Sequence, residues 1–180
     1  MATSHALLLF CNLAFGLLAL SVVVESSVVP PDYAEVDHVC SRTAPYYDKF
    51  CKDVLESDPR APGADALTLA YVAFGLAHRN ASGTRDQITS LLSNSTGLVR
   101  QHLERCRGYY ATALANIQEA LNDMDSKTYG RLTYFSASLL DRAKDCESAF
   151  KGTKSPLTDN NEDLKGFSVI GVSIAEELIV

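Results

Sequence analysis

The sequence lacks the motifs by which most enzymes are recognised. It contains no glycine-rich phosphate loop, no nucleophile elbow and no paired histidines of the metalloprotease type. It also has no excess of positive charge, because 16 lysines and arginines stand against 22 aspartates and glutamates, a net charge of −6. An acidic chain is a poor partner for nucleic acid or for an anionic membrane surface. We therefore predict a protein that is not an enzyme, has no catalytic residues and uses no cofactor.

Strand patterns are missing as well, since no segment alternates apolar and polar residues over the length of a strand. Helical periodicity takes their place, most clearly in a stripe of apolar and small residues that steps by four and three from Val99 to Met124. Such stripes predict four long helices, at about residues 64–93, 98–124, 127–151 and 159–179. The predicted fold is all-α, an antiparallel four-helix bundle preceded by a short N-terminal helical hairpin.

Two local features refine these helix boundaries. The segment from Asn80 to Gly83 interrupts the apolar stripe of the first long helix, and we expect a kink or a weak point there. Ser126 is a suitable N-cap, so the third long helix is predicted to begin directly after it.

Cysteine is scarce, with five in the whole chain, and Cys11 lies in the apolar N-terminal stretch. The other four are Cys40, Cys51, Cys106 and Cys146. The first two are centred beside Pro45 and the last two on Ser126. Residues equidistant from the turn of an antiparallel helical hairpin lie side by side. Four cysteines allow three pairings, and this symmetry favours the two sequential ones.

The longer of these predicted disulfides joins residues 40 positions apart. On the loop-entropy model it stabilises the bundle by about 3–4 kcal/mol. A zinc site is the alternative interpretation of these cysteines, because His38 and Cys40 place two ligand types close together. No second close pair of ligands follows, and we therefore predict no metal site.

The N-terminal stretch from Ala6 to Val24 is apolar apart from three residues. It fits either a cleaved signal peptide or a membrane anchor. Val24 and Ser26 suit the −3 and −1 positions before a cleavage site, so we predict a signal peptide over residues 1–26. Cleavage removes Cys11 and leaves an even number of cysteines, as expected of a protein from an oxidising compartment. The mature chain then has no membrane anchor.

Two Asn-X-Ser/Thr sequons agree with this secretory route. They begin at Asn80 and Asn94, and neither contains proline. Both asparagines are candidates for glycosylation.

Of the histidines, His102 points off the apolar stripe and is expected at the surface, where a catalytic role is not favoured.

The residues around the cysteines resemble those of the plant invertase and pectin methylesterase inhibitor family. The similar segments include Cys40 to Thr43, Tyr47 to Cys51, Asp58 with Pro59, Pro62 to Asp65, Ser136 to Leu139, and Asp145 to Glu147. The resemblance covers essentially all of the mature chain. It implies one inhibitor domain over residues 27–180, with the hairpin at about 33–58 and the bundle at about 64–179, and it agrees with the two sequential disulfides.

The resemblance also implies a function. Members of the family are secreted proteins that bind pectin methylesterase or invertase one to one and cover the carbohydrate-binding cleft, with no chemistry of their own. The implied location is the plant cell wall, or alternatively the vacuole. A second hypothesis is a secreted helical-bundle binding protein of the same fold that does not inhibit an enzyme.

Invertase inhibitors of this family carry a Pro-Lys-Phe motif near the start of the third bundle helix. In the matching stretch Lys127 corresponds to the lysine, Ser126 replaces the proline, and the aromatic residue is Tyr129 after an extra Thr128. Lys127 and Tyr129 are therefore our candidate target-binding residues. The alternative is that Lys127 is merely solvated and Tyr129 belongs to the core.

Overall fold

The computed structural model describes residues 30–179. The chain divides into two units, Met1–Pro30 and Pro31–Val180, and every helix described below lies in the second. The predicted signal peptide and Cys11 lie outside the described residues, so signal cleavage stays a prediction. Among the described helices, none has the length and apolar character needed to cross a membrane.

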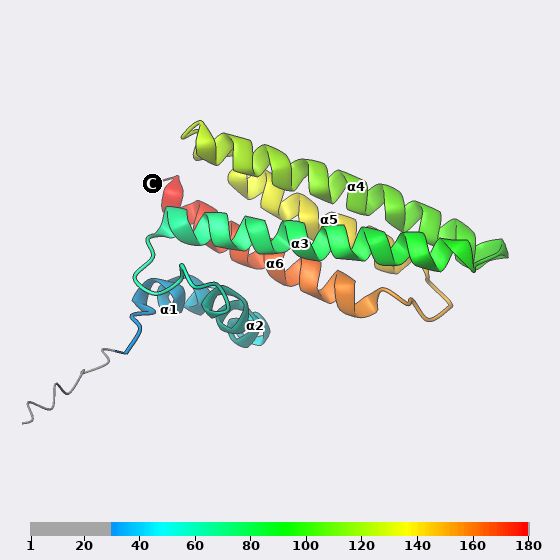
Figure 1. Cartoon of the computed structure of the whole chain (residues 1–180), viewed down its shortest axis with the longest axis horizontal. Coiled ribbons are helices and arrows are strands. Elements are labelled where there is room, and N and C mark those ends of the chain that lie inside the picture. The colour runs from blue at the N-terminus through cyan, green and yellow to red at the C-terminus, as the bar shows by residue number, and fades with distance from the viewer. Residues whose placement is uncertain (1–29, 180) are drawn as a thin grey trace, which may run out of the picture. The chain divides into compact units, whose positions relative to one another are not determined.

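Helices account for all the regular structure of residues 30–179 (Figure 1). They are α1 (Ala34–Ser41), α2 (Pro45–Glu56), α3 (Ala66–Ser93), α4 (Gly97–Asp125), the short 3₁₀ helix η1 (Tyr129–Arg131), α5 (Leu132–Ala149) and α6 (Thr158–Leu178). Figure 1 shows α3, α4, α5 and α6 running alongside one another. The prediction of an all-α four-helix bundle after a short hairpin is confirmed.

Three details differ from the sequence-based expectations. α3 runs without a break through Asn80 and Gly83, because Ala81 is fully buried and packing overrides the weak local pattern. Val99 is 43% exposed, so the buried stripe of α4 begins one turn later, at Leu103. The third long helix begins at residue 132 rather than 127, because residues 126–128 belong to the hydrogen-bonded end of α4.

Both sequential disulfides are present, as predicted. Cys40 and Cys51 join α1 to α2 with a Cα–Cα distance of 5.5 Å. Cys106 and Cys146 join α4 to α5 at 4.7 Å, and all four residues are fully buried. These separations are well below the usual 8–10 Å between helix axes, so each pair must lie on the contact faces of its two helices.

A second close approach holds α5 against α6. Ser136 of α5 is fully buried and lies directly beside Gly171 of α6, where a Cβ atom would come within 2.5 Å of the serine Oγ. The missing side chain at Gly171 therefore sets the distance between these two helices.

A buried polar network links three of the bundle helices. The Tyr110 hydroxyl of α4 donates to Asn161 Oδ1 of α6 at 2.9 Å. Asn161 Nδ2 and the Thr158 hydroxyl donate in turn to the two carboxylate oxygens of Glu147 on α5, at 2.6 and 2.8 Å. Burial raises the pKa of Tyr110, so its proton stays available as a donor. Such a satisfied network fixes the relative register of the helices.

The α1–α2 hairpin is attached to the bundle mainly through α6. Ser173 donates to the Val39 carbonyl at 2.8 Å in a buried hydrogen bond. The Phe50 ring lies over Gly166 and meets the Phe167 ring edge-on at 5.6 Å. Arg42 adds ion pairs to Glu176 and Glu177 near the end of α6.

Loss of the α4–α5 disulfide will cost more stability than loss of the hairpin disulfide. Replacing Cys106 and Cys146 together by alanine is expected to lower the free energy of unfolding by about 3–4 kcal/mol, because the bond closes the longer loop. The matched control replaces Cys40 and Cys51 together. Chemical denaturation of both variants measures the difference, and a larger loss in the hairpin variant would contradict the expectation.

A side chain at residue 171 will force α5 and α6 apart. Gly171→Ala is expected to lower the free energy of unfolding by about 1–3 kcal/mol, as overpacking of a core does. Gly108→Ala is the matched control, because that helical glycine of α4 meets open space and its replacement should raise stability by about 0.5–1 kcal/mol. Equal effects of the two substitutions in chemical denaturation would show that the contact does not limit packing.

Candidate functional site

The loop between α4 and α5 carries the two candidate target-binding residues. α4 ends in a Schellman motif, in which the Thr128 amide donates to the Asp123 carbonyl at 2.8 Å and the Lys127 amide to the Met124 carbonyl at 3.0 Å. Ser126 is thus the C-cap of α4. The prediction that it caps the next helix is wrong, because these bonds extend the end of α4 through Thr128.

Lys127 occupies a backbone position that normally requires glycine. Its φ is +56°, and it is the one non-glycine residue with positive φ among residues 30–179. The left-handed conformation costs roughly 1–2 kcal/mol for a residue with a Cβ atom, and helices that end in this motif usually place glycine there. A lysine held at such a cost points to a role for its side chain, which is exposed.

Asp123 and Arg131 hold the two ends of the loop together. The Asp123 side chain is only 7% exposed, and Arg131 donates to both of its oxygens, with Nε at 2.9 Å from Oδ2. The Thr128 hydroxyl donates to the Asp123 carbonyl at 3.2 Å, and the Arg131 guanidinium lies 5.0 Å from the Phe135 ring centre. The hydrogen bond to Asp123 raises the pKa of Arg131. The loop is therefore built around one buried carboxylate.

Tyr129 has a mixed environment. It is half-buried and packs against the hydrophobic core from the 3₁₀ turn η1. Nearby in the chain, Asp125 accepts a hydrogen bond from the Tyr71 hydroxyl of α3 at 2.8 Å, and this bond raises the pKa of Tyr71. The contact of Tyr129 with the core attaches the loop to the bundle. Lys127 is the exposed member of the candidate pair.

The remaining candidates lie elsewhere. His102 is half-buried against the Phe150 ring, 5.2 Å between ring centres, so its expected position at the surface is wrong, because a side chain off the main stripe still packs against the next helix. Asn80 is half-buried within α3, and Asn94 is exposed at its C-terminal end. Within residues 30–179, no group of three or more His, Cys, Asp or Glu side chains is placed to hold a metal ion.

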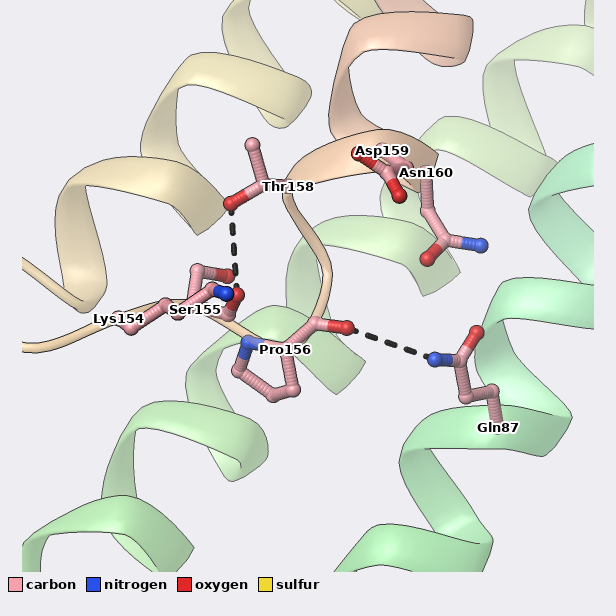
Figure 2. A pocket seen from close by; sticks show the side chains of 7 residues that line it. All are labelled: Gln87, Lys154, Ser155, Pro156, Thr158, Asp159 and Asn160. Carbon is pink, nitrogen blue, oxygen red and sulfur yellow. Dashed lines mark hydrogen bonds between the residues drawn. The ribbon is translucent and has the colours of Figure 1, made fainter.

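A polar hollow of about 450 Å³ lies where the connection between α5 and α6 meets α3 (Figure 2). Gln87 reaches the Pro156 carbonyl across it at 3.5 Å, and the Thr158 hydroxyl meets the Ser155 carbonyl at 3.4 Å. Its lining side chains carry amide, hydroxyl, carboxylate and ammonium groups without histidine or cysteine. The hollow is at the opposite end of α5 from Lys127.

Replacing the strained lysine by glycine will stabilise the protein. Lys127→Gly is expected to raise the free energy of unfolding by about 0.5–1 kcal/mol, because relief of the left-handed conformation exceeds the added entropy of the unfolded chain. Lys144→Gly is the control, since Lys144 is an exposed residue within α5 and glycine there should cost about 1 kcal/mol. The free energy of unfolding of both variants is measured by chemical denaturation. A change of the same sign in both would contradict this account of Lys127.

The family model described as plant invertase/pectin methylesterase inhibitor matches residues 34–175. Among curated proteins, the chain is 29% identical to a Platanus acerifolia protein named as a candidate invertase inhibitor, over 90% of this chain and 91% of the relative. It is 28% identical to "Cell wall / vacuolar inhibitor of fructosidase 2" of Arabidopsis thaliana, over 86% of this chain and 83% of that relative. It is 27% identical to "Pectinesterase inhibitor" of Actinidia deliciosa, over 87% of this chain and 85% of that relative.

Solved structures of the same kind share the fold. A mutant form of a pectin methylesterase inhibitor from Arabidopsis superposes with a TM-score of 0.69 at 20% identity, covering 79% of this chain and 95% of that one. The family match spans both disulfides, the hairpin, and the bundle with its α4–α5 loop. The chain belongs to the plant invertase/pectin methylesterase inhibitor family.

Proposed function

We propose that this protein inhibits a plant cell-wall carbohydrate-acting enzyme, pectin methylesterase or invertase, by binding one to one over its active-site cleft. The observation that carries the proposal is the family match across the disulfide-linked bundle, with relatives named for inhibition of each enzyme. Inhibition of this kind requires a rigid surface that fits the cleft and no catalytic group of the inhibitor.

The α4–α5 loop is the docking element in this proposal. Lys127 is exposed at its tip, while the Schellman bonds and the Asp123–Arg131 pair fix the backbone on either side. A loop already held in one conformation loses little entropy when it binds, so its contacts contribute more fully to affinity. Tyr129 adds a half-exposed aromatic surface next to the cation.

The exposed ammonium group of Lys127 favours invertase of the two targets. Invertase cleaves a glycosidic bond, and most glycoside hydrolases place a pair of carboxyl groups in the cleft. The Lys127 ammonium group is complementary to such a cleft in charge and extends from the end of the bundle. A charge pair between Lys127 and such a carboxylate would add to affinity where the interface excludes water from it.

The proposed location is the cell wall, with the vacuole as the other compartment. The predicted signal peptide over residues 1–26 would direct the chain into the secretory pathway, and the two buried disulfides suit an oxidising compartment. One relative carries both compartments in its name.

Loss of the Lys127 side chain will weaken inhibition. The purified protein is titrated against plant invertase and against pectin methylesterase from acidic to neutral pH, and Lys127→Ala is expected to raise the inhibition constant for invertase about 10–100-fold. Lys144→Ala, an exposed lysine of α5, should leave it unchanged.

Each outcome of these titrations has a defined meaning. Equal inhibition by Lys127→Ala and the parent chain would remove the loop from the interface but keep the proposed function. Inhibition of pectin methylesterase alone would overturn the choice of invertase. Failure to inhibit either enzyme would reject the proposed function in favour of a non-inhibitory secreted binding protein.

A further inference from the structure

The two sequons of the chain have different surroundings in the folded protein. Asn80 lies in the middle of α3 and faces α6, where its Nδ2 donates to Asp163 Oδ2 at 3.2 Å. Its Oδ1 is buried without a hydrogen-bond partner in the described structure. Burial also raises the pKa of Asp163, as expected for a carboxyl group at a poorly hydrated helix contact. A sugar on the Asn80 amide would have to fit between α3 and α6.

Asn94 is exposed, at the C-cap of α3. Its turn is held by neighbouring groups, because the Ser95 hydroxyl donates to the Leu91 carbonyl at 2.7 Å and Arg100 Nη1 donates to the Leu92 carbonyl at 2.8 Å. Thr96, the third residue of the sequon, is also exposed and has an extended backbone. The structure therefore presents this sequon on an ordered surface turn that a bulky group can occupy without moving a helix.

Two solvent-exposed apolar side chains follow this turn directly in the sequence. Leu98 is 67% exposed and Val99 is 43% exposed, both in the first turn of α4. The two side chains together leave apolar surface in contact with water. A bulky, solubilising oligosaccharide on Asn94 would shield both of them.

The position of Asn94 is also compatible with target binding. α4 has 29 residues, which corresponds to a length of about 43 Å at 1.5 Å per residue. That helix separates the Asn94 turn from the loop that carries Lys127. A glycan at Asn94 would therefore extend from the end of the bundle opposite the docking loop.

We propose that Asn94 carries an N-linked glycan and that Asn80 does not. The donor is a lipid-linked oligosaccharide diphosphate of the secretory lumen. The Asn94 amide nitrogen forms a bond to the anomeric carbon, the bond from that carbon to the diphosphate oxygen breaks, the lipid diphosphate leaves with the electron pair, and the amide loses one proton. The proposal depends on passage into that lumen and is independent of enzyme inhibition.

The test compares the full-length parent chain with Asn80→Gln and Asn94→Gln, each produced in plant cells. Mass is measured before and after treatment with a peptide N-glycosidase. The parent and Asn80→Gln are expected to lose one glycan, and Asn94→Gln none. A glycan that persists in Asn94→Gln, two glycans on the parent, or none on the parent would each overturn the proposal.

A control variant separates the choice of sequon from delivery to the lumen. Lys151→Asn creates a new sequon with Gly152 and Thr153 on the exposed α5–α6 connection, and this variant should carry two glycans. If it carries one while the parent carries none, the chain reaches the lumen and Asn94 is not used. If both carry none, delivery itself fails, and the proposal fails with it.

A second readout tests the shielding of the apolar pair. Asn94→Gln is expected to bind an apolar fluorescent dye more strongly than the glycosylated parent, and Asn94→Gln combined with Leu98→Ser should return to the parental signal. Equal dye binding by the parent and Asn94→Gln would show that the glycan does not cover Leu98 and Val99.

Discussion

The covalent bond between Cys106 and Cys146 is the constraint on which the rest of the architecture depends. It brings the backbones of α4 and α5 to 4.7 Å at its two Cα atoms, and so fixes the distance between these helices in the N-terminal half of α4 and near the C-terminal end of α5. The hydrogen bonds from Tyr110 and Asn161 to their partners lie next to this level of the bundle and extend the same alignment to α6. With α4, α5 and α6 fixed, the hairpin has a firm surface to pack against, and the α4–α5 loop has two immobile ends.

Much of this architecture could be predicted from the sequence because it rests on periodic patterns. The stripe from Leu103 to Met124 has the helical period over its whole length, and the symmetric spacing of the cysteines gives their pairing. The helix start after Ser126 could not be predicted in the same way. Serine suits either end of a helix, and the choice depends on whether Lys127 adopts a conformation that residue statistics assign to glycine or asparagine.

The candidate site was predictable only in part. The resemblance to invertase inhibitors selects Lys127, but no sequence pattern shows its left-handed backbone or the carboxylate that holds the loop. Asp123 and Arg131 are eight residues apart on either side of a turn, so their contact depends on the path of the chain between them. The one sequence signal for this contact is the position of Asp123 next to Met124, at the end of the apolar stripe. Both residues are buried, and a buried carboxylate without a partner would be unfavourable.

The disulfide between α4 and α5 has a further consequence for the response of the chain to proteolysis. It encloses the whole α4–α5 loop, including the exposed basic residues Lys127 and Arg131, within one covalent ring. A single cut beside either residue would open this ring but release neither helix, because the disulfide bond still joins the two halves of the chain. The two new chain ends would remain next to each other, held by the packed helices, so a nicked inhibitor keeps its parts together.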